Sequence, residues 1–104
     1  MRGRDIALGP GKAELLELIG RTGSINKAAG QMDMSYMRAW SLVQTMNASF
    51  KEPLVIAAQG GTGGGGAELT ETGRRTLALY RQMEQQAARA TQSSWKKMQS
   101  LLKL

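Results

Sequence analysis

The chain of 104 residues contains no cysteine and no histidine, and these two absences exclude several kinds of chemistry. Without cysteine there is no disulfide framework and no thiolate metal site. Without histidine, the usual zinc sites and the commonest general base are also missing. We therefore expect no catalytic residues, no metal and no cofactor, and we expect the protein not to be an enzyme.

Long apolar stretches are missing as well. No run approaches the roughly 20 apolar residues that a membrane-spanning helix requires. The segment from Met1 to Asp5 lacks the apolar part of a signal peptide. The length suits one domain with a modest core. We expect a cytoplasmic protein without a membrane partner.

Positive charge exceeds negative charge, with 14 Lys and Arg against 8 Asp and Glu and a net charge of +6 at pH 7. Such a balance favours an anionic partner, most often nucleic acid or an anionic membrane surface. A basic domain without an anionic partner is the alternative that charge alone leaves open.

The stretch from Ser24 to Asn47 predicts two short helices separated by a turn at Asp33 and Met34. Each helix begins at a serine that can cap its free amides, Ser24 for the first and Ser35 for the second. The first helix has one side of small or apolar residues, Ile25, Ala28, Ala29 and Met32. This arrangement is a helix-turn-helix, in which the second helix can enter the major groove of DNA.

The second helix, from about Tyr36 to Ala48, is expected to have a buried side and a polar side. The buried side is predicted to hold Tyr36, Trp40, Val43 and Asn47 flanked by Ala39, Met46 and Phe50, and the polar side Arg38, Ser41 and Thr45 with Met37 and Gln44 at its margin. Arg38 can pair with guanine and Gln44 with adenine. Ser41 and Thr45 can contact phosphate or a thymine methyl group. A surface helix whose polar side is only solvated is the alternative.

A β-hairpin is predicted to follow, with strands at Leu54 to Ala58 and Ala67 to Leu69 and a glycine-rich tip between them. A hairpin in this position is a wing, and glycine amides at its tip can approach and bind phosphate. The spacing Gly61-x-Gly63-x-x-Gly66 also matches a dinucleotide-binding fingerprint. Any glycine-rich run produces that match, and the chain has too few strands for the dinucleotide fold. A plain flexible loop is the other alternative.

A helix is predicted on each side of these elements, and residues 6–8 are predicted to form a short strand. The first helix, Lys12 to Gly20, supports the domain with an apolar stripe. The last helix begins at Thr70 and continues to about Leu101, with a stripe made of Leu77, Tyr80, Met83, Ala87, Ala90, Ser94, Met98 and Leu101. Because it is longer than a compact domain of this size, we expect it to pack on a second copy. Its lysines leave a membrane-surface helix as a minor alternative.

Several short motifs resemble one protein family. They are Gly23-Ser24-Ile25, Ala28-Ala29, Met34-Ser35-Tyr36, Arg38-Ala39-Trp40, Met46-Asn47 and the glycine-rich stretch with Gly73 after it. From about Leu8 to Tyr80 the chain resembles the N-terminal domain of ModE-type molybdate-responsive transcription regulators. The resemblance implies a winged helix-turn-helix that dimerises through its first and last helices. It also implies binding to a palindromic operator in double-stranded DNA.

The chain departs from this family at positions that bear on DNA binding. Members often have a basic residue at the positions of Met37 and Thr62, and a Glu-Arg pair at Ile56-Ala57. The wing is therefore less positive, which places more of the recognition on Arg38. Full-length members add a molybdate-binding module, for which this chain has no room, so we expect no oxyanion sensing.

The sequence thus predicts a mainly α protein with a small β-hairpin wing: a winged helix-turn-helix in residues 1–70 and a dimerisation helix in residues 71–104. We predict a homodimeric, sequence-specific DNA-binding transcription regulator. The alternative is a protein-interaction module that pairs with a full-length member of the family. The predicted DNA contacts are Ser24, Lys27, Ser35, Tyr36, Met37, Arg38, Ser41, Gln44, Thr45, Gly61, Thr62, Gly63 and Gly64. The predicted dimer contacts are Leu15, Ile19, Tyr80, Met83, Ala87, Ala90, Met98 and Leu101.

Overall fold

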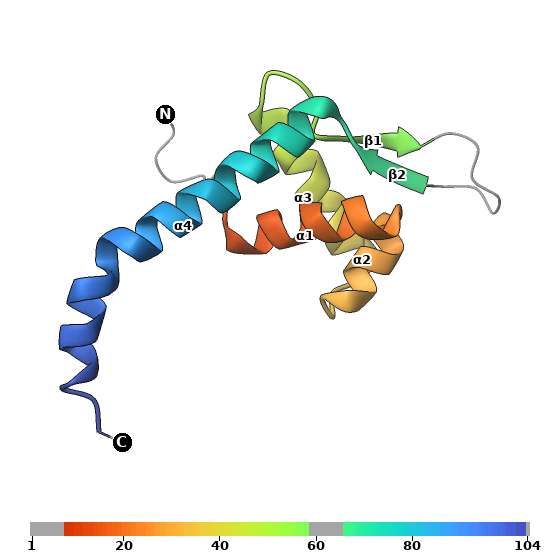
Figure 1. Ribbon diagram of the computed structural model, residues 1–104. Helices are drawn as coiled ribbons and strands as arrows, with labels where there is room; N and C mark the ends of the chain where they lie inside the picture. Colours follow the sequence, from red (N-terminus) through yellow and green to blue (C-terminus); the bar gives the residue numbers. More distant parts are fainter. Residues whose placement is uncertain (1–7, 59–65, 104) are drawn as a thin grey trace.

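The computed structural model describes residues 8–58 and 66–103, which contain four helices and one hairpin. The elements are, in order, α1 (Pro10–Thr22), α2 (Ile25–Gln31), α3 (Tyr36–Ser49), β1 (Val55–Ala58), β2 (Gly66–Leu69) and α4 (Glu71–Gln99). The hairpin projects from one side of the packed helices, and the far end of α4 projects from the other (Figure 1). This arrangement confirms the predicted winged helix-turn-helix with a long C-terminal helix. None of the described helices is both long and apolar enough to cross a membrane.

Three hydroxyl groups fix where the helices begin. The side-chain oxygen of Ser24 accepts the amide of Lys27 at 3.0 Å, that of Ser35 accepts the amide of Arg38 at 3.1 Å, and that of Thr70 accepts the amide of Gly73 at 2.9 Å. Each bond satisfies an amide that the first helical turn leaves free, and such a cap is typically worth about 1 kcal/mol. The predicted starts of α2, α3 and α4 are therefore confirmed to within a residue.

The core lies where α1, α2 and α3 meet beneath the base of the hairpin. Its largest fully buried side chains are Leu15, Leu16, Ile19, Met46 and Leu54. Burial of each such side chain stabilises the fold by roughly 1.5–3 kcal/mol. Between them lie three buried alanines, Ala28, Ala29 and Ala39, whose small size lets α2 and α3 approach closely.

The assignment of Leu15 and Ile19 to a dimer interface is wrong. Both side chains have no exposed surface within the single chain. The physical reason is that α1 contacts α2, α3, α4 and β2, so the chain's own core occupies its apolar stripe. Neither side chain is available to a second copy.

The first predicted strand is also not observed in the described residues. Leu8 lies in a bend that packs on the core, and residues 6 and 7 are outside the described part of the chain. The first helix is longer than predicted, from Pro10, which suits the first helical position, to Thr22. It ends at Gly23, whose φ of 71° is the left-handed conformation that favours glycine.

The hairpin is antiparallel, and it is held to the helices at its base. Val55 pairs with Leu69, and Ala58 pairs with Gly66. The amide of Ala67 in β2 donates to the carbonyl of Gly23 at 3.0 Å. The carbonyl of Leu54 accepts the amide of Thr70 at 2.9 Å, which joins the start of β1 to the start of α4.

Gly73 provides a test of this junction. A methyl group at this position would collide with the carbonyl oxygen of Leu54, so the first turn of α4 would have to move away. We expect Gly73→Ala to lower the free energy of unfolding by about 1–3 kcal/mol, as overpacking typically does. Urea unfolding followed by circular dichroism measures this change.

Gly30→Ala is the matched control, since nothing lies within 4 Å of the added methyl group on α2. It is expected to be neutral or to stabilise by up to about 1 kcal/mol. Equal stabilities of the two variants would contradict the proposed packing of Leu54 on Gly73.

Candidate nucleic-acid interface

The turn between α2 and α3 holds the two helices in a fixed relation. Asp33 adopts the left-handed conformation with φ of 54°, and the amide of Met34 donates to the carbonyl of Ala29 at 3.0 Å. Ser35 then caps α3. The turn predicted at Asp33 and Met34 is therefore confirmed, and it presents the first turn of α3 at the surface.

The buried side of α3 is narrower than the sequence indicates. Ala39, Val43 and Met46 are its buried residues, whereas Tyr36 is 45% exposed and Trp40 is 43% exposed. The assignment of both aromatic side chains to the core is therefore wrong. The reason is that α3 packs on the core through Ala39, Val43 and Met46, and this rotation places the two rings on the flank of the helix.

This rotation also changes which residues occupy the middle of the exposed face. Successive residues turn by about 100° around a helix. Opposite Ala39, Val43 and Met46 lie Met37, Ser41, Gln44 and Ala48, all of them exposed. Met37 and Gln44, predicted at the margin, are thus central, and Arg38 lies exposed toward one edge.

Two hydroxyl groups of this face already have local roles. The hydroxyl of Thr45 donates to the carbonyl of Ser41 at 3.1 Å, so its hydrogen is used within the helix while its methyl group is free. The oxygen of Ser35 accepts an amide, and its hydrogen can still be donated to an acceptor such as a phosphate. The oxygen of Ser24 likewise accepts an amide at the start of α2, beside exposed Lys27, and its hydrogen can also still be donated.

A groove of about 310 Å³ runs between α3 and the hairpin. Its walls come from the first residues of α2, from one flank of α3 and from both strands, and they include Asn26, Tyr36, Trp40, Gln44, Asn47, Ile56 and Ala57. Ile56 is partly exposed there, opposite Glu68 in the hairpin register. The aromatic rings of α3 therefore line a surface groove.

Asn47 joins the end of α3 to the beginning of the wing. Its side-chain oxygen accepts the amides of Leu54 at 2.8 Å and Val55 at 3.2 Å, and its amide group donates to the carbonyl of Val55 at 3.0 Å. The sequence places Asn47 only on the buried side of the helix. The one sequence signal that suggests this role is a polar side chain in the last turn of a helix, eight residues before a strand begins.

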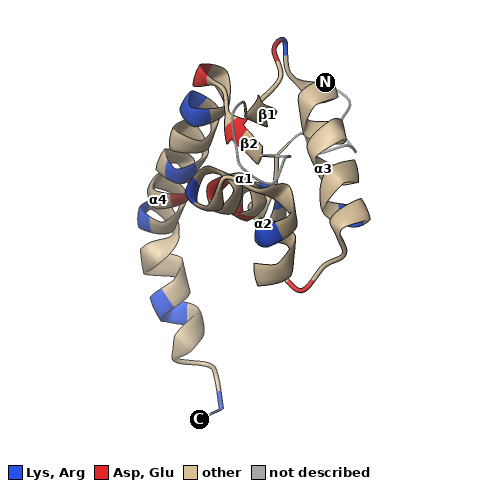
Figure 2. Cartoon of the chain, turned by 90° about the vertical axis from the view of Figure 1, so that its right-hand side faces the viewer, with Lys and Arg blue, Asp and Glu red and all other residues tan. Residues whose placement is uncertain are grey.

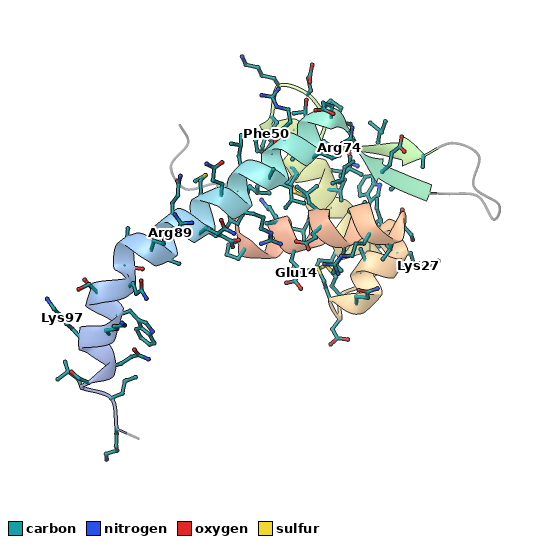
Figure 3. The ribbon with its side chains drawn as sticks, in the orientation of Figure 1. Glu14, Lys27, Phe50, Arg74, Arg89 and Lys97 are labelled. Carbon is teal, nitrogen blue, oxygen red and sulfur yellow. The ribbon has the colours of Figure 1, made fainter. Side chains whose placement is uncertain are left out.

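Positive charge is unevenly distributed over these elements (Figure 2). Residues 71–103 contain seven Lys or Arg and two Glu, a net charge of +5 out of the chain's +6. The helix-turn-helix contributes Lys27 and Arg38, neither of which forms an ion pair with another described residue. In Figure 3, Lys27 on α2 lies far from Arg89 and Lys97 on α4.

The amino-acid sequence was compared with those of known proteins to find its relatives. No protein-family model matches the chain. It is 49% identical over 78 residues to the molybdenum transport protein ModE of Azotobacter vinelandii, which covers 75% of this chain and 29% of that protein. It is 44% identical over 86 residues to the molybdenum-pterin-binding protein MopB of Rhodobacter capsulatus, or 83% and 32% of the two chains. It is 42% identical over 71 residues to the DNA-binding transcriptional dual regulator ModE of Escherichia coli (strain K12), or 68% and 27%.

This chain is a homologue of the ModE-type proteins. The resemblance that the short motifs indicate is thereby confirmed. The chain spans less than a third of the length of each of these three relatives. The relative from Escherichia coli is by its name a DNA-binding transcription regulator, whereas the name of MopB refers to a molybdenum pterin.

The predicted wing-tip contacts lie outside the described residues. These contacts are Gly61, Thr62, Gly63 and Gly64. The described part of the hairpin has two antiparallel strands and not the parallel strand–helix–strand unit of a dinucleotide-binding fold. The glycine fingerprint therefore has no matching framework among the described elements.

The first half of α4 is fastened to α1 by an ion-pair cluster. Arg81 donates to Glu17 at 2.5 Å and to Glu84 at 2.9 Å, and Glu17 also accepts from Arg21 at 2.8 Å. The hydrogen bond from Arg81 holds the pKa of the Glu17 carboxyl below its ordinary value, and the two glutamates raise the pKa of Arg81. These charges are partly solvated, so we expect each pair to contribute at most about 1 kcal/mol.

The second half of α4 makes no comparable contact with the described domain. Tyr80 is partly buried, but every residue from Gln82 to Lys103 is exposed. The exposed set includes the predicted dimer contacts Met83, Ala87, Ala90, Met98 and Leu101. Trp95 and Leu102 are exposed as well. This part of the helix has an apolar stripe that the single chain leaves uncovered.

Replacement of Asn47 tests whether it holds the wing. Asn47→Ala removes three hydrogen bonds and leaves the amide of fully buried Leu54 without its acceptor. We expect the free energy of unfolding to fall by roughly 2 kcal/mol or more, since one buried unsatisfied group costs about 1–3 kcal/mol. Chemical denaturation measures the loss.

Asn47→Asp is the informative comparison, because it keeps the acceptor for both amides and loses only the donor to Val55. Its loss of stability should be smaller. An alanine variant as stable as the parent would show that these bonds do not hold the wing.

Proposed function

We propose that the chain is a cytoplasmic, homodimeric transcription regulator that binds a palindromic operator in double-stranded DNA. The main support is the exposed face of α3, which a capped turn presents at the surface of a helix-turn-helix. Homology to a named DNA-binding regulator agrees with this function. In this proposal α3 enters the major groove and the wing lies over the neighbouring backbone.

The side chains of α2 and α3 have distinct chemical roles in the proposed complex. Arg38 has five donors in a fixed fork that fits guanine, and Gln44 can pair with adenine. Lys27 neutralises a phosphate, and the hydroxyl groups of Ser24, Ser35 and Ser41 donate to phosphate oxygens. Thr45 uses its methyl group, because its hydroxyl is bonded within the helix. Tyr36 and Met37 contact the DNA from the first turn of α3.

The second half of α4 supplies the proposed dimer interface. An exposed helix of this length is stable chiefly when its apolar side is packed. A second copy provides a matching stripe, with Tyr80, Met83, Ala87, Ala90, Met98 and Leu101 as the proposed contacts. With the usual geometry, the two recognition helices would then reach half-sites about 34–36 Å apart on one side of the duplex.

A protein-interaction module is the second candidate function. The observation that favours it is that α4 carries most of the chain's net charge together with an apolar stripe that the single chain leaves uncovered. In that case the stripe of α4 would pair with a longer ModE-type protein. The two functions differ in whether the isolated chain binds DNA.

A salt titration of binding to random duplex DNA tests the main proposal. A dimer in which Lys27 of both copies neutralises a phosphate should show a slope of about −2 in log K against log salt concentration. Fluorescence anisotropy of a labelled duplex gives both the affinity and the slope. No binding at low salt would favour the protein-interaction module.

The variant Arg38→Ala should weaken binding to a selected operator by about 1–3 kcal/mol if the side chain pairs with a base. Arg89→Ala, which removes the same charge from the far part of α4, should have a smaller effect. Equal losses of affinity in the two variants would show that Arg38 does not pair with a base.

Charge placed in the apolar stripe of α4 tests the dimer. Ala87→Glu puts a carboxylate in the stripe and should shift the protein to the monomer in sedimentation velocity, since an unpaired charge is costly to bury. Gln85→Glu places the same group on the opposite side of the helix, about 160° from Ala87, and should leave the dimer intact. Dissociation of both variants to the same extent would contradict the proposed interface.

A further inference from the structure

The exposed face of α3 has an apolar patch among its polar side chains. Met37 is 68% exposed, the most of any large apolar side chain on this helix, and neighbouring Tyr36 is 45% exposed. Exposed apolar side chains that lie together often mark a binding site. The core does not need these residues, because Ala39, Val43 and Met46 provide its contacts with α3. The patch therefore needs an explanation outside the stability of the single chain.

Met37 is placed to meet a base and not the backbone of DNA. It is the second residue of α3, and the N-terminal residues of a recognition helix contact base edges. It does not line the groove beside the hairpin, whereas Tyr36 and Trp40 do. Ser41 and Gln44 follow it along the same exposed row at four- and seven-residue steps. Met37 thus stands at the leading end of the face that would enter the major groove.

The chemistry of methionine restricts what it can recognise there. Its thioether has no hydrogen to donate, and its sulfur is only a weak acceptor. Against a polar base edge it would leave a donor or acceptor without a partner, which is unfavourable. The major groove offers one apolar group, the C5 methyl group of thymine. We propose that Met37, with Tyr36 beside it, selects thymine by packing on this methyl group.

This inference rests on the proposed DNA-binding function and names a specificity contact within it. A protein partner fits this face less well, because Arg38 lies beside Met37 with a positive charge that forms no ion pair with another described residue. The chain also carries a larger apolar stripe on α4 for protein contacts. The occupant of the Met37 patch is therefore duplex DNA.

Replacement of thymine by deoxyuridine tests the contact, because it removes the methyl group and keeps every hydrogen-bonding group of the base. An operator is first selected from a random duplex pool, and each of its thymines is then replaced singly. Burial of one methyl group corresponds to roughly a fourfold change in affinity. We expect a loss of about 3–10-fold at one or two positions in each half-site. An affinity that changes at no position would overturn the inference while leaving the proposed DNA binding intact.

Two variants of Met37 then assign the contact to this side chain. Met37→Leu keeps an apolar group, so the preference for thymine over deoxyuridine should persist at the sensitive positions. Met37→Gln has a similar length and helix propensity but a polar end, and it should bring the ratio of the two affinities close to one. Ala48→Ser changes the far end of the same exposed face, at a residue with no proposed DNA contact, and should leave this ratio unchanged.

The outcomes separate the two proposals. A glutamine variant that still prefers thymine would assign the methyl contact to another side chain and overturn the role of Met37. Absence of binding to any duplex in the pool would overturn both the DNA-binding function and this contact. The inference would be supported if Met37→Gln, and neither of the other two variants, lost the preference for thymine over deoxyuridine. Its affinity for the deoxyuridine operator should then be nearly unchanged.

Discussion

The backbone of Leu54 is the point on which the relative positions of α3, the hairpin and α4 depend. Its amide is bound by Asn47 at the end of α3, its carbonyl is bound by Thr70 at the start of α4, and its side chain is fully buried. Gly73 leaves space for the same carbonyl. Because one residue is held from three sides, the hairpin and α3 are joined firmly at this point. The surface that faces the proposed DNA is therefore set by contacts on the opposite side of α3.

Packing through alanine has a second consequence for that surface. Ala28 and Ala29 of α2 and Ala39 of α3 are buried in the core, and their small size lets the helices approach closely. Met37 lies on the side of α3 opposite buried Ala39, Val43 and Met46, and it is therefore exposed. In this fold, the core determines which side chains the surface presents.

Much of the fold could be predicted from the sequence, because its signals are local. Ser24, Ser35 and Thr70 mark helix starts by their own chemistry. The rotation of α3 could not be predicted in the same way, since the assumption that Tyr36 and Trp40 are buried ignores which neighbour the helix packs against. The clamp by Asn47 depends on a strand several residues away. The burial of Leu15 and Ile19 depends on the elements that pack on α1, which include β2 and α4, more than 40 residues later in the chain.

The distribution of charge assigns two kinds of interaction to different parts of the chain in the proposed DNA complex. Net charge indicates an anionic partner, yet most of it lies on α4, and α3 carries a single arginine. Electrostatic attraction falls off over about 8–10 Å at physiological salt, so distant charges attract DNA without selecting a sequence. Selection of a base sequence must then come from short-range contacts on α3. There Arg38, Gln44 and Met37 would each recognise a different group of the bases. A recognition face with little charge and a partly apolar centre gains little from non-specific attraction. Its affinity for a correct site should therefore depend more on the fit of these few side chains than on the basic composition of the chain.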